Sequence, residues 1–169
     1  MFACVDVQYD DASSTAKAAV AAFLGWSSPC AFEEHVVTIP VTEPYVAGQF
    51  YKRELPCLLS VLQLLQAEPE IVLVDGYVWL KDGAEGLGAH LHRSLSGPSI
   101  VGVAKKDFEG SPAIPVYRGG SKAPLYVTSV GISPHEASRG VTDMHGKYRI
   151  PTLLKRVDHL ARGHELPIL

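Results

Sequence analysis

The sequence lacks long apolar runs and contains few cysteines. No apolar stretch approaches the roughly 20 residues that a membrane helix needs, and no basic-then-apolar leader of the secretory kind begins the chain. We therefore expect a cytoplasmic protein with no membrane partner. The three cysteines, Cys4, Cys30 and Cys57, are an odd number spaced far apart in apolar surroundings. This predicts reduced core residues rather than disulfides or zinc ligands.

A strong net charge is also absent, but the charges are distributed unevenly. The net charge of −3 is not typical of a nucleic-acid binder. Residues 1–100 carry 5 basic and 12 acidic side chains, whereas residues 101–169 carry 10 basic and 6 acidic ones. Such polarity can place an acidic metal centre beside a basic groove for phosphates. A chance distribution over a solvated surface is the alternative.

The first part of the chain predicts strands. With 169 residues, 47% of them apolar, the chain suits one domain over residues 1–169 with a sizeable core. Strands are predicted over residues 2–9, 15–25 and 32–41. The middle segment is rich in alanine, which favours a helix by propensity, but it lies between two strands at hairpin-like spacing, which favours a strand.

The remainder alternates between helices and strands. A loop through Pro44 to Gly48 precedes a helix with Pro56 near its first turn and leucines at helical spacing, and Pro69 ends that helix. The further elements predicted are a strand over 70–75, a helix over about 85–95, strands over 99–104, 114–118 and 124–130, and a helix from Pro151. The order implies parallel strands covered by helices, and therefore an α/β fold with a mixed sheet flanked by helices.

Three aspartates occupy positions that suit a site. Asp6 and Asp75 each end an apolar run typical of a buried strand, and Asp158 lies at the margin of the apolar face of the last helix. Strand-end aspartates also cap turns, and Asp158 can pair with Arg162 at i+4, so both structural alternatives stay open. If the three carboxylates converge, their repulsion is relieved by cations such as Mg²⁺ or Mn²⁺. Such a site suits phosphodiester hydrolysis.

Five motifs in register resemble the endonuclease V family. The segment Pro44-Tyr45-Val46-Ala47-Gly48, followed by aromatic residues and Arg53-Glu54, resembles the family's Pro-Tyr-Ile-Pro-Gly and Arg-Glu motif. The other four are the segments around Asp6, Asp75-Gly76, Gly86 to His90 with Val101 to Lys106, and Tyr148 to Pro151. The resemblance spans about residues 3 to 162 and implies a ribonuclease H-like fold.

The resemblance also implies roles for individual residues. Family members use Mg²⁺ to cut DNA, and in some cases RNA, 3′ to a deaminated base such as inosine, an activity of DNA repair. The implied metal ligands are Asp6, Asp75 and Glu54, the last from just before the first long helix. Asp158 completes the site or assists the attacking water, and Lys105 offsets charge at the scissile phosphate.

Substrate handling is implied for a second set of residues. Tyr45 matches a wedge tyrosine that fills the stack when a base is extruded. Gly48, Gly76 and Gly86 would let the backbone approach a hypoxanthine base closely. His90, on an apolar helix face, is predicted to be structural.

The sequence departs from the family mainly where substrate is handled. Family members usually have an N-terminal segment before the first strand motif, which we expect to be missing here. The second proline of the wedge is Ala47, and bulky residues, Tyr77 to Leu80, follow Gly76. Three functions therefore stay open: an endonuclease acting on inosine-containing DNA, an endoribonuclease directed by inosine or structure, and a catalytically idle nucleic-acid-binding protein.

Overall fold

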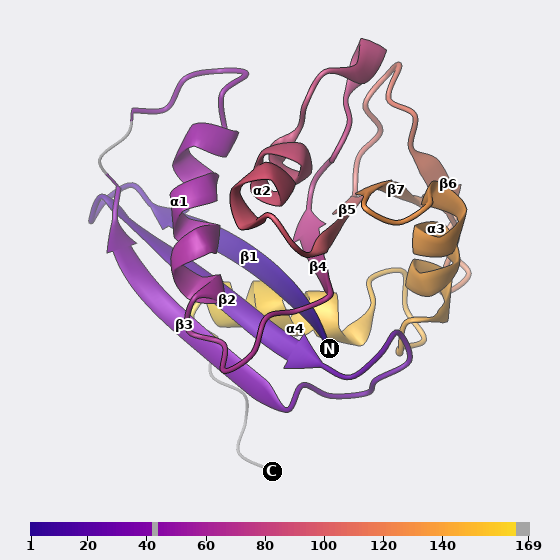
Figure 1. Ribbon diagram of the computed structural model, residues 1–169, viewed down its shortest axis with the longest axis horizontal. Helices are drawn as coiled ribbons and strands as arrows, with labels where there is room; N and C mark the ends of the chain where they lie inside the picture. The colour runs from indigo at the N-terminus through magenta and orange to yellow at the C-terminus, as the bar shows by residue number, and fades with distance from the viewer. Residues whose placement is uncertain (42–43, 165–169) are drawn as a thin grey trace.

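The computed structural model describes residues 1–41 and 44–164, which form a seven-stranded mixed sheet in the order β3-β2-β1-β4-β5-β7-β6 (Figure 1). The strands are β1 (Phe2–Asp10), β2 (Thr15–Phe23), β3 (Glu33–Pro40), β4 (Ile71–Asp75), β5 (Ser99–Ala104), β6 (Ile114–Val116) and β7 (Leu125–Val130). The antiparallel meander of β1 to β3 is followed by β4 and β5, which run parallel to β1. The predicted arrangement of strands is confirmed.

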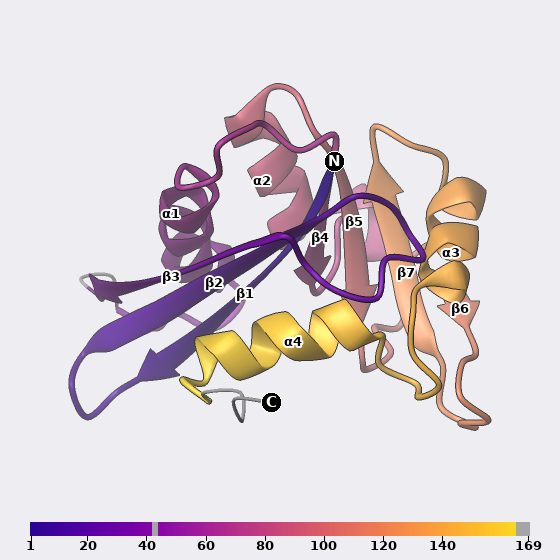
Figure 2. The same ribbon diagram turned by 90° about the horizontal axis from the view of Figure 1, so that it is seen from below.

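Helices cover both faces of this sheet. They are α1 (Tyr51–Leu62), α2 (Leu87–Leu95), α3 (Pro134–Asp143) and α4 (Thr152–Ala161), with a short 3₁₀ turn at Lys81–Gly83. Figure 2 shows α1 and α2 on one side of the sheet and α4 on the other. Because strand side chains alternate in direction, Val5 and Val74 pack towards α1, whereas Cys4 and Leu73 pack towards α4. No helix within the described ranges is long and apolar enough to cross a bilayer.

The alanine-rich segment is a strand, as hairpin spacing predicts. In β2 the side chains from Ala18 to Phe23 are fully buried between the two helical layers. Small side chains let α1 and α4 both approach this strand closely, and both helices contact it. Burial on two faces therefore outweighs the helix propensity of alanine.

Four further features of the structure were not predicted from the sequence. The first helix begins at Tyr51, well before Pro56, so Glu54 lies inside its first turn rather than just before it. Helix α3 was not predicted, because its buried side chains are few and small, among them Ala137 and Val141. Cys30 is exposed, unlike Cys4 and Cys57. Arg156 of α4 forms a bidentate ion pair with Glu34 of β3.

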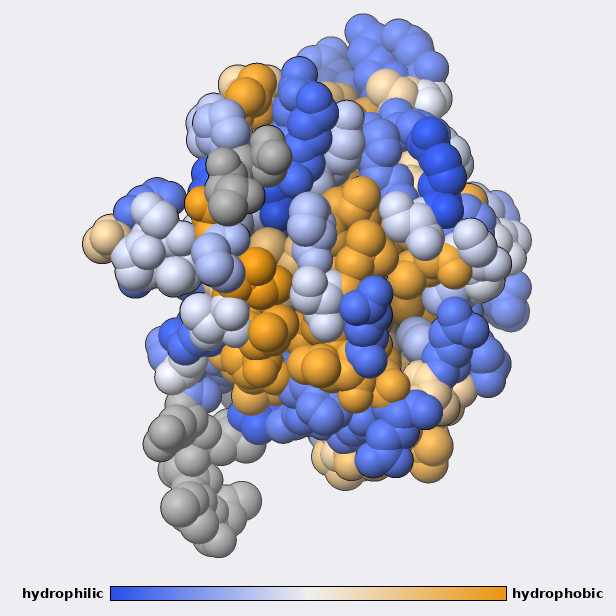
Figure 3. Space-filling view, turned by 60° about the vertical axis from the view of Figure 1, so that its left-hand side comes forward, coloured by the Kyte–Doolittle hydropathy of each residue, from blue (hydrophilic) through white to orange (hydrophobic). Residues whose placement is uncertain are grey.

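The face that carries β3 and α1 shows a broad apolar area (Figure 3). One hollow of about 910 Å³ lies between the C-terminal parts of α1 and α2 and includes Leu59, Leu65 and Leu95 in its lining. These leucines belong to the amphipathic pattern that predicts α1 and α2. The apolar stripe of these helices is therefore only partly covered by the sheet.

Candidate active site

The strand register brings two aspartates side by side. Val5 of β1 pairs with Val74 of the parallel strand β4, so Asp6 and Asp75 follow at neighbouring positions on the same face of the sheet. Asp75 pairs in turn with Val103 of β5, two residues before Lys105. Parallel pairing alone therefore places the two carboxylates and the ammonium group along one row.

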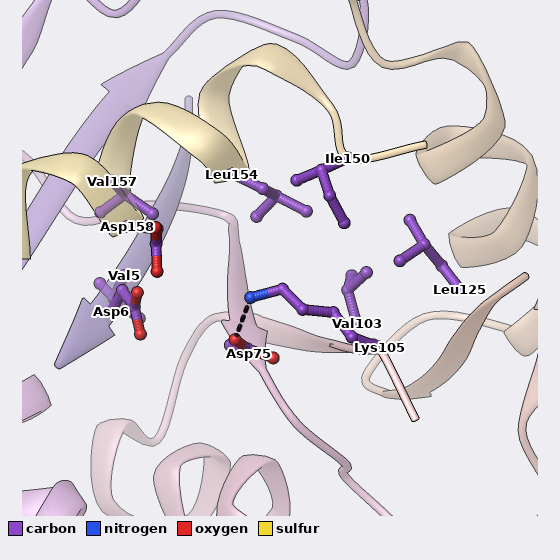
Figure 4. A pocket seen from close by; sticks show the side chains of 10 residues that line it. All are labelled: Val5, Asp6, Asp75, Val103, Lys105, Leu125, Ile150, Leu154, Val157 and Asp158. Atoms are coloured by element: carbon purple, nitrogen blue, oxygen red, sulfur yellow. Dashed lines mark hydrogen bonds and ion pairs between the residues drawn. The ribbon is translucent and has the colours of Figure 1, made fainter. Parts of the chain in front are cut away.

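Helix α4 adds a third carboxylate to this row. A hollow of about 340 Å³ between the sheet and α4 is lined by Asp6, Asp75, Lys105 and Asp158, with Ile150 and Leu154 among its apolar wall (Figure 4). In that view the carboxylates of Asp6 and Asp158 lie close to each other, and the Lys105 side chain extends towards Asp75. Residues far apart in sequence thus meet at one hollow.

The carboxylate of Asp75 is held by the ammonium group of Lys105 rather than by a turn. Lys105 Nζ donates to Asp75 Oδ2 at 2.7 Å, and both side chains are about two-fifths exposed. Burial lowers the pKa of Lys105, but the hydrogen bond to Asp75 and the negative charge of that carboxylate outweigh burial and raise the pKa above its ordinary value. The position of Asp75 is therefore not explained by turn capping, the alternative that the sequence left open.

Asp6 and Glu54 are partly buried carboxyl groups. Burial, together with the charges of Asp75 and Asp158, raises the pKa of Asp6 to about 7, against the effect of the Val7 N–H bonded to it at 2.8 Å. Burial, followed by the charges of Asp6 and Asp75, raises the pKa of Glu54 to about 7 as well. Glu54 does not line the hollow of Figure 4, because it comes from α1 on the other face of the sheet.

Asp158 pairs with Arg162 and also lines the hollow. Its two carboxylate oxygens accept from Arg162 Nε at 3.0 and 2.9 Å, which is the i+4 pair of the structural alternative. Burial opposes ionisation, but Arg162 and then Lys105 lower the pKa of Asp158 below its ordinary value. Asp158 is therefore an ionised group that is paired on one side and faces the hollow on the other.

The donors around the hollow are carboxylate oxygens, the kind of atom that a hard divalent cation prefers. Within residues 1–41 and 44–164, no three Asp, Glu, His or Cys side chains converge closely enough to enclose one ion. However, the charges of Asp75 and Asp158 act on the partly buried Asp6, and the charges of Asp6 and Asp75 act on the partly buried Glu54. Burying mutually repelling carboxylates is costly unless cations offset their charge, and oxygen donors of this kind suit Mg²⁺ or Mn²⁺.

Two arginines that the sequence did not single out as site residues hold this region together. Arg118, which is 8% exposed, donates to the carbonyl groups of Thr142, Met144, Gly146, Tyr148 and Arg149. Arg149 Nη2 in turn donates to the carbonyls of Lys105 and Pro124. The segment that leads into α4 is thereby tied to the end of β5, beside Lys105.

Replacing Arg118 by Met tests this scaffold. We expect Arg118→Met to lower the free energy of unfolding by about 3 kcal/mol, because several buried carbonyls lose a charged donor. Urea denaturation followed by circular dichroism measures the loss. The exposed Arg139→Met is the control, with an expected change within about 0.5 kcal/mol; equal stability of the two variants would contradict the scaffold role.

Two residues assigned to substrate lie on an open loop. Tyr45 is 60% exposed, and its ring meets that of Phe50 edge to face at 5.2 Å. Gly48 has a φ of +78°, a conformation that favours glycine. Neither residue lines the hollow of Figure 4. The wedge role of Tyr45 remains a prediction that its exposure permits.

The other two glycines shape the backbone after β4. Gly76 has a φ of +136°, and a Cβ at Gly86 would collide with the backbone carbonyl of Tyr77. The side chains that follow are anchored: the Tyr77 hydroxyl donates to the Lys106 carbonyl at 2.6 Å, and Trp79 Nε1 donates to Ser129 O at 3.0 Å. Bulky groups therefore occupy this segment in fixed positions.

His90 packs against neighbouring side chains, and its predicted structural role stays a prediction. Its ring stacks on that of Tyr51 with 3.7 Å between centroids, and Glu85 lies 3.8 Å from its Nδ1 atom. Arg53 has a comparable supporting role, since its guanidinium lies 4.3 Å from the centroid of the Tyr9 ring. These contacts fix the first turn of α1, which carries Glu54.

Fold and site together define a class. A mixed sheet of ribonuclease H-like type that gathers carboxylates beside its parallel strands suits a metal-dependent nuclease. The family model described as Endonuclease V matches residues 1–132. The chain belongs to the endonuclease V family. Asp158 and the segment preceding α4 lie outside that match, so their place beside Asp6 comes from the structure.

Curated relatives are about one-third identical to this chain over the aligned residues. An endonuclease V of Xanthomonas axonopodis is 34% identical over 74% of this chain and 52% of its own length. One of Xylella fastidiosa is 32% identical over 98% of this chain and 78% of its own length. The chain thus spans about half the length of the Xanthomonas relatives.

Solved structures share the fold. Endonuclease V of Streptomyces avermitilis superposes with a TM-score of 0.76 at 29% identity, covering 96% of this chain and 79% of its own. Human ENDOV gives 0.78 at 28%, covering 96% and 83%. A Ciona intestinalis endonuclease V in complex with DNA containing an inosine gives 0.83, covering 96% and 83%; at 19% identity this likeness shows the fold alone.

Proposed function

We propose that this chain is a metal-dependent endonuclease that hydrolyses a phosphodiester 3′ to a deaminated base in DNA. The observation that carries the proposal is the meeting of Asp6, Asp75 and Asp158 with Lys105 around one hollow in a chain of this family. The family relationship supports nuclease activity, and the hollow supplies groups that suit it. Mg²⁺ is the proposed cofactor, with Mn²⁺ as a substitute.

Each residue has a distinct task in this proposal. Asp6, Asp75 and Glu54 hold the cation, which when bound favours ionisation of a water and stabilises the leaving oxygen. Asp158, kept ionised by Arg162, orients the attacking water or accepts its proton. Lys105, on the hollow beside Asp75, offsets charge that develops on the phosphate as the bond to the leaving oxygen breaks.

Inosine-containing DNA is the proposed substrate, with Tyr45 as the wedge and the loops of Gly48, Gly76 and Gly86 around the base. The Ciona relative, which was crystallised with such DNA, makes this the first polymer to test. The anchored side chains of Tyr77 and Trp79 sit where the family has smaller residues. We therefore propose a base preference that is broader than inosine.

A cleavage panel tests the function. The protein is incubated with Mg²⁺ or Mn²⁺ and end-labelled strands of DNA and RNA that contain inosine, uracil or only ordinary bases. We expect cutting of the inosine-containing DNA near the lesion and no cutting in EDTA. Cutting of RNA alone would replace DNA by RNA as the substrate. Binding without cutting under every condition would contradict the enzymatic proposal.

A further inference from the structure

A second groove opens directly from the catalytic hollow. It has a volume of about 930 Å³ and shares Lys105, Ile150, Leu154 and Asp158 with the hollow. Its remaining lining includes Ser121, Tyr148 and Lys155. A polymer whose reacting bond lies at Asp158 therefore has a continuous path past the start of α4 into this groove.

The groove is predominantly basic. Lys105, Arg149 and Lys155 line it, and Asp158 is its sole acidic lining residue. Lys155 is exposed and forms no ion pair within the described part of the chain. All three cations come from residues 101–169, the half of the sequence with an excess of positive charge. The uneven charge of the sequence thus corresponds to a local arrangement, with carboxylates in the hollow and cations beside it.

An exposed aromatic ring lies along the same path. Tyr148 is 61% exposed, and Lys147 Nζ lies 5.3 Å from the centroid of its ring. The backbone of Tyr148 is fixed by Arg118, and the turn at Gly119 packs so tightly against it that a Cβ there would lie 2.6 Å from the Tyr148 carbonyl carbon. A solvent-facing aromatic ring on a fixed backbone, beside cations, is an arrangement that suits stacking of unpaired bases.

We propose that this groove binds unpaired nucleotides of the substrate strand on one side of the scissile bond, with Lys155 at a phosphate and Tyr148 under a base. The proposal rests on the proposed function, since it needs a nucleic-acid strand at the hollow. It commits to single-stranded nucleic acid because stacking on Tyr148 requires a base that is free of its partner. The anchored Arg149 supplies positive charge at the groove wall and stays attached to the carbonyls of Lys105 and Pro124.

Substrate length provides the test. Binding is measured in EDTA by fluorescence anisotropy with three inosine-containing single strands. The first is extended on both sides of the scissile bond. The second is shortened to one nucleotide on the 5′ side of that bond, and the third is shortened to one nucleotide on its 3′ side. Tyr148→Ala should weaken binding about tenfold for the strand extended on both sides and for one truncated strand. It should leave the other truncated strand unaffected. Tyr117→Ala, which removes an equally exposed tyrosine outside the groove lining, should change none of them.

Salt dependence tests the phosphate contact separately. For the strand extended on both sides, Lys155→Ala should reduce the slope of log affinity against log salt by about 0.7. The exposed Lys81→Ala should leave the slope unchanged.

Three outcomes would overturn the proposal. The first is that the Tyr148→Ala and Lys155→Ala variants bind the strands with the affinity of the wild type. The second is that Tyr148→Ala weakens binding of all three strands equally. In both, cleavage by the wild-type protein would leave the proposed function standing. The third is failure of the wild type to bind or cut any strand, which would overturn both proposals.

Discussion

Asp75→Asn should lower the cleavage rate by about a thousandfold. The substitution keeps the size of the side chain but removes the charge that faces Asp6 and accepts from Lys105. Metal-assisted stabilisation of transition-state charge contributes several kcal/mol, and each 1.36 kcal/mol is a factor of ten in rate. Single-turnover cleavage of inosine-containing DNA with saturating Mg²⁺ measures the effect.

The matched control is Asp143→Asn. Asp143 is exposed at the end of α3 and does not line the hollow, so its loss should change the rate by less than a factor of about two, as is usual for surface substitutions. Equal rates for Asp75→Asn and the wild type would remove Asp75 from the catalytic groups. Circular dichroism serves as the folding control, because it distinguishes a folded, inactive Asp75→Asn protein from an unfolded one.

Mg²⁺ or Mn²⁺ should raise the melting temperature by about 5–10 °C. A ligand at 100 times its Kd stabilises the folded state by about 2.7 kcal/mol, and 1 kcal/mol corresponds to about 2–4 °C for a chain of this size. The physical reason is that Asp6 and Glu54 are partly buried near other carboxylates, whose repulsion a cation relieves. Differential scanning fluorimetry in EDTA and in excess metal measures the shift.

Asp6→Asn should abolish that shift without lowering the melting temperature in EDTA. A neutral amide avoids the cost of burying a charge, so a loss of the metal response separates ligation from general destabilisation. Asp143→Asn should retain the full shift. A metal response of Asp6→Asn as large as that of the wild type would show that the cation binds elsewhere.

The fold was largely predictable because its elements have simple patterns. The apolar runs that end at Asp6 and Asp75 predict buried strands, and the leucine periodicity predicts α1. The exact start of α1 was not predictable, since Arg53 stacks on Tyr9 and extends the helix in front of Pro56. Helix α3 has few apolar residues in its sequence and depends on tertiary packing against β6 and β7.

The site was predictable only where its residues lie within sequence motifs. Motif order identified the carboxylates and Lys105, but Arg118 follows a short strand with no motif around it. Its role depends on five carbonyl groups from residues 142 to 149, which only the folded chain brings together. The uneven charge of the sequence indicated that a basic groove could exist, but not where. Its position depends on the fold, which brings Tyr148 and Lys155 together.

The location of the metal tests the account most directly. Crystals soaked in Mn²⁺ and measured at the manganese absorption edge give an anomalous signal wherever the ion binds. We expect a peak in contact with carboxylate oxygens of Asp6 and Asp75. No peak at these carboxylates at a saturating Mn²⁺ concentration, or a peak confined to other surface groups, would contradict the account.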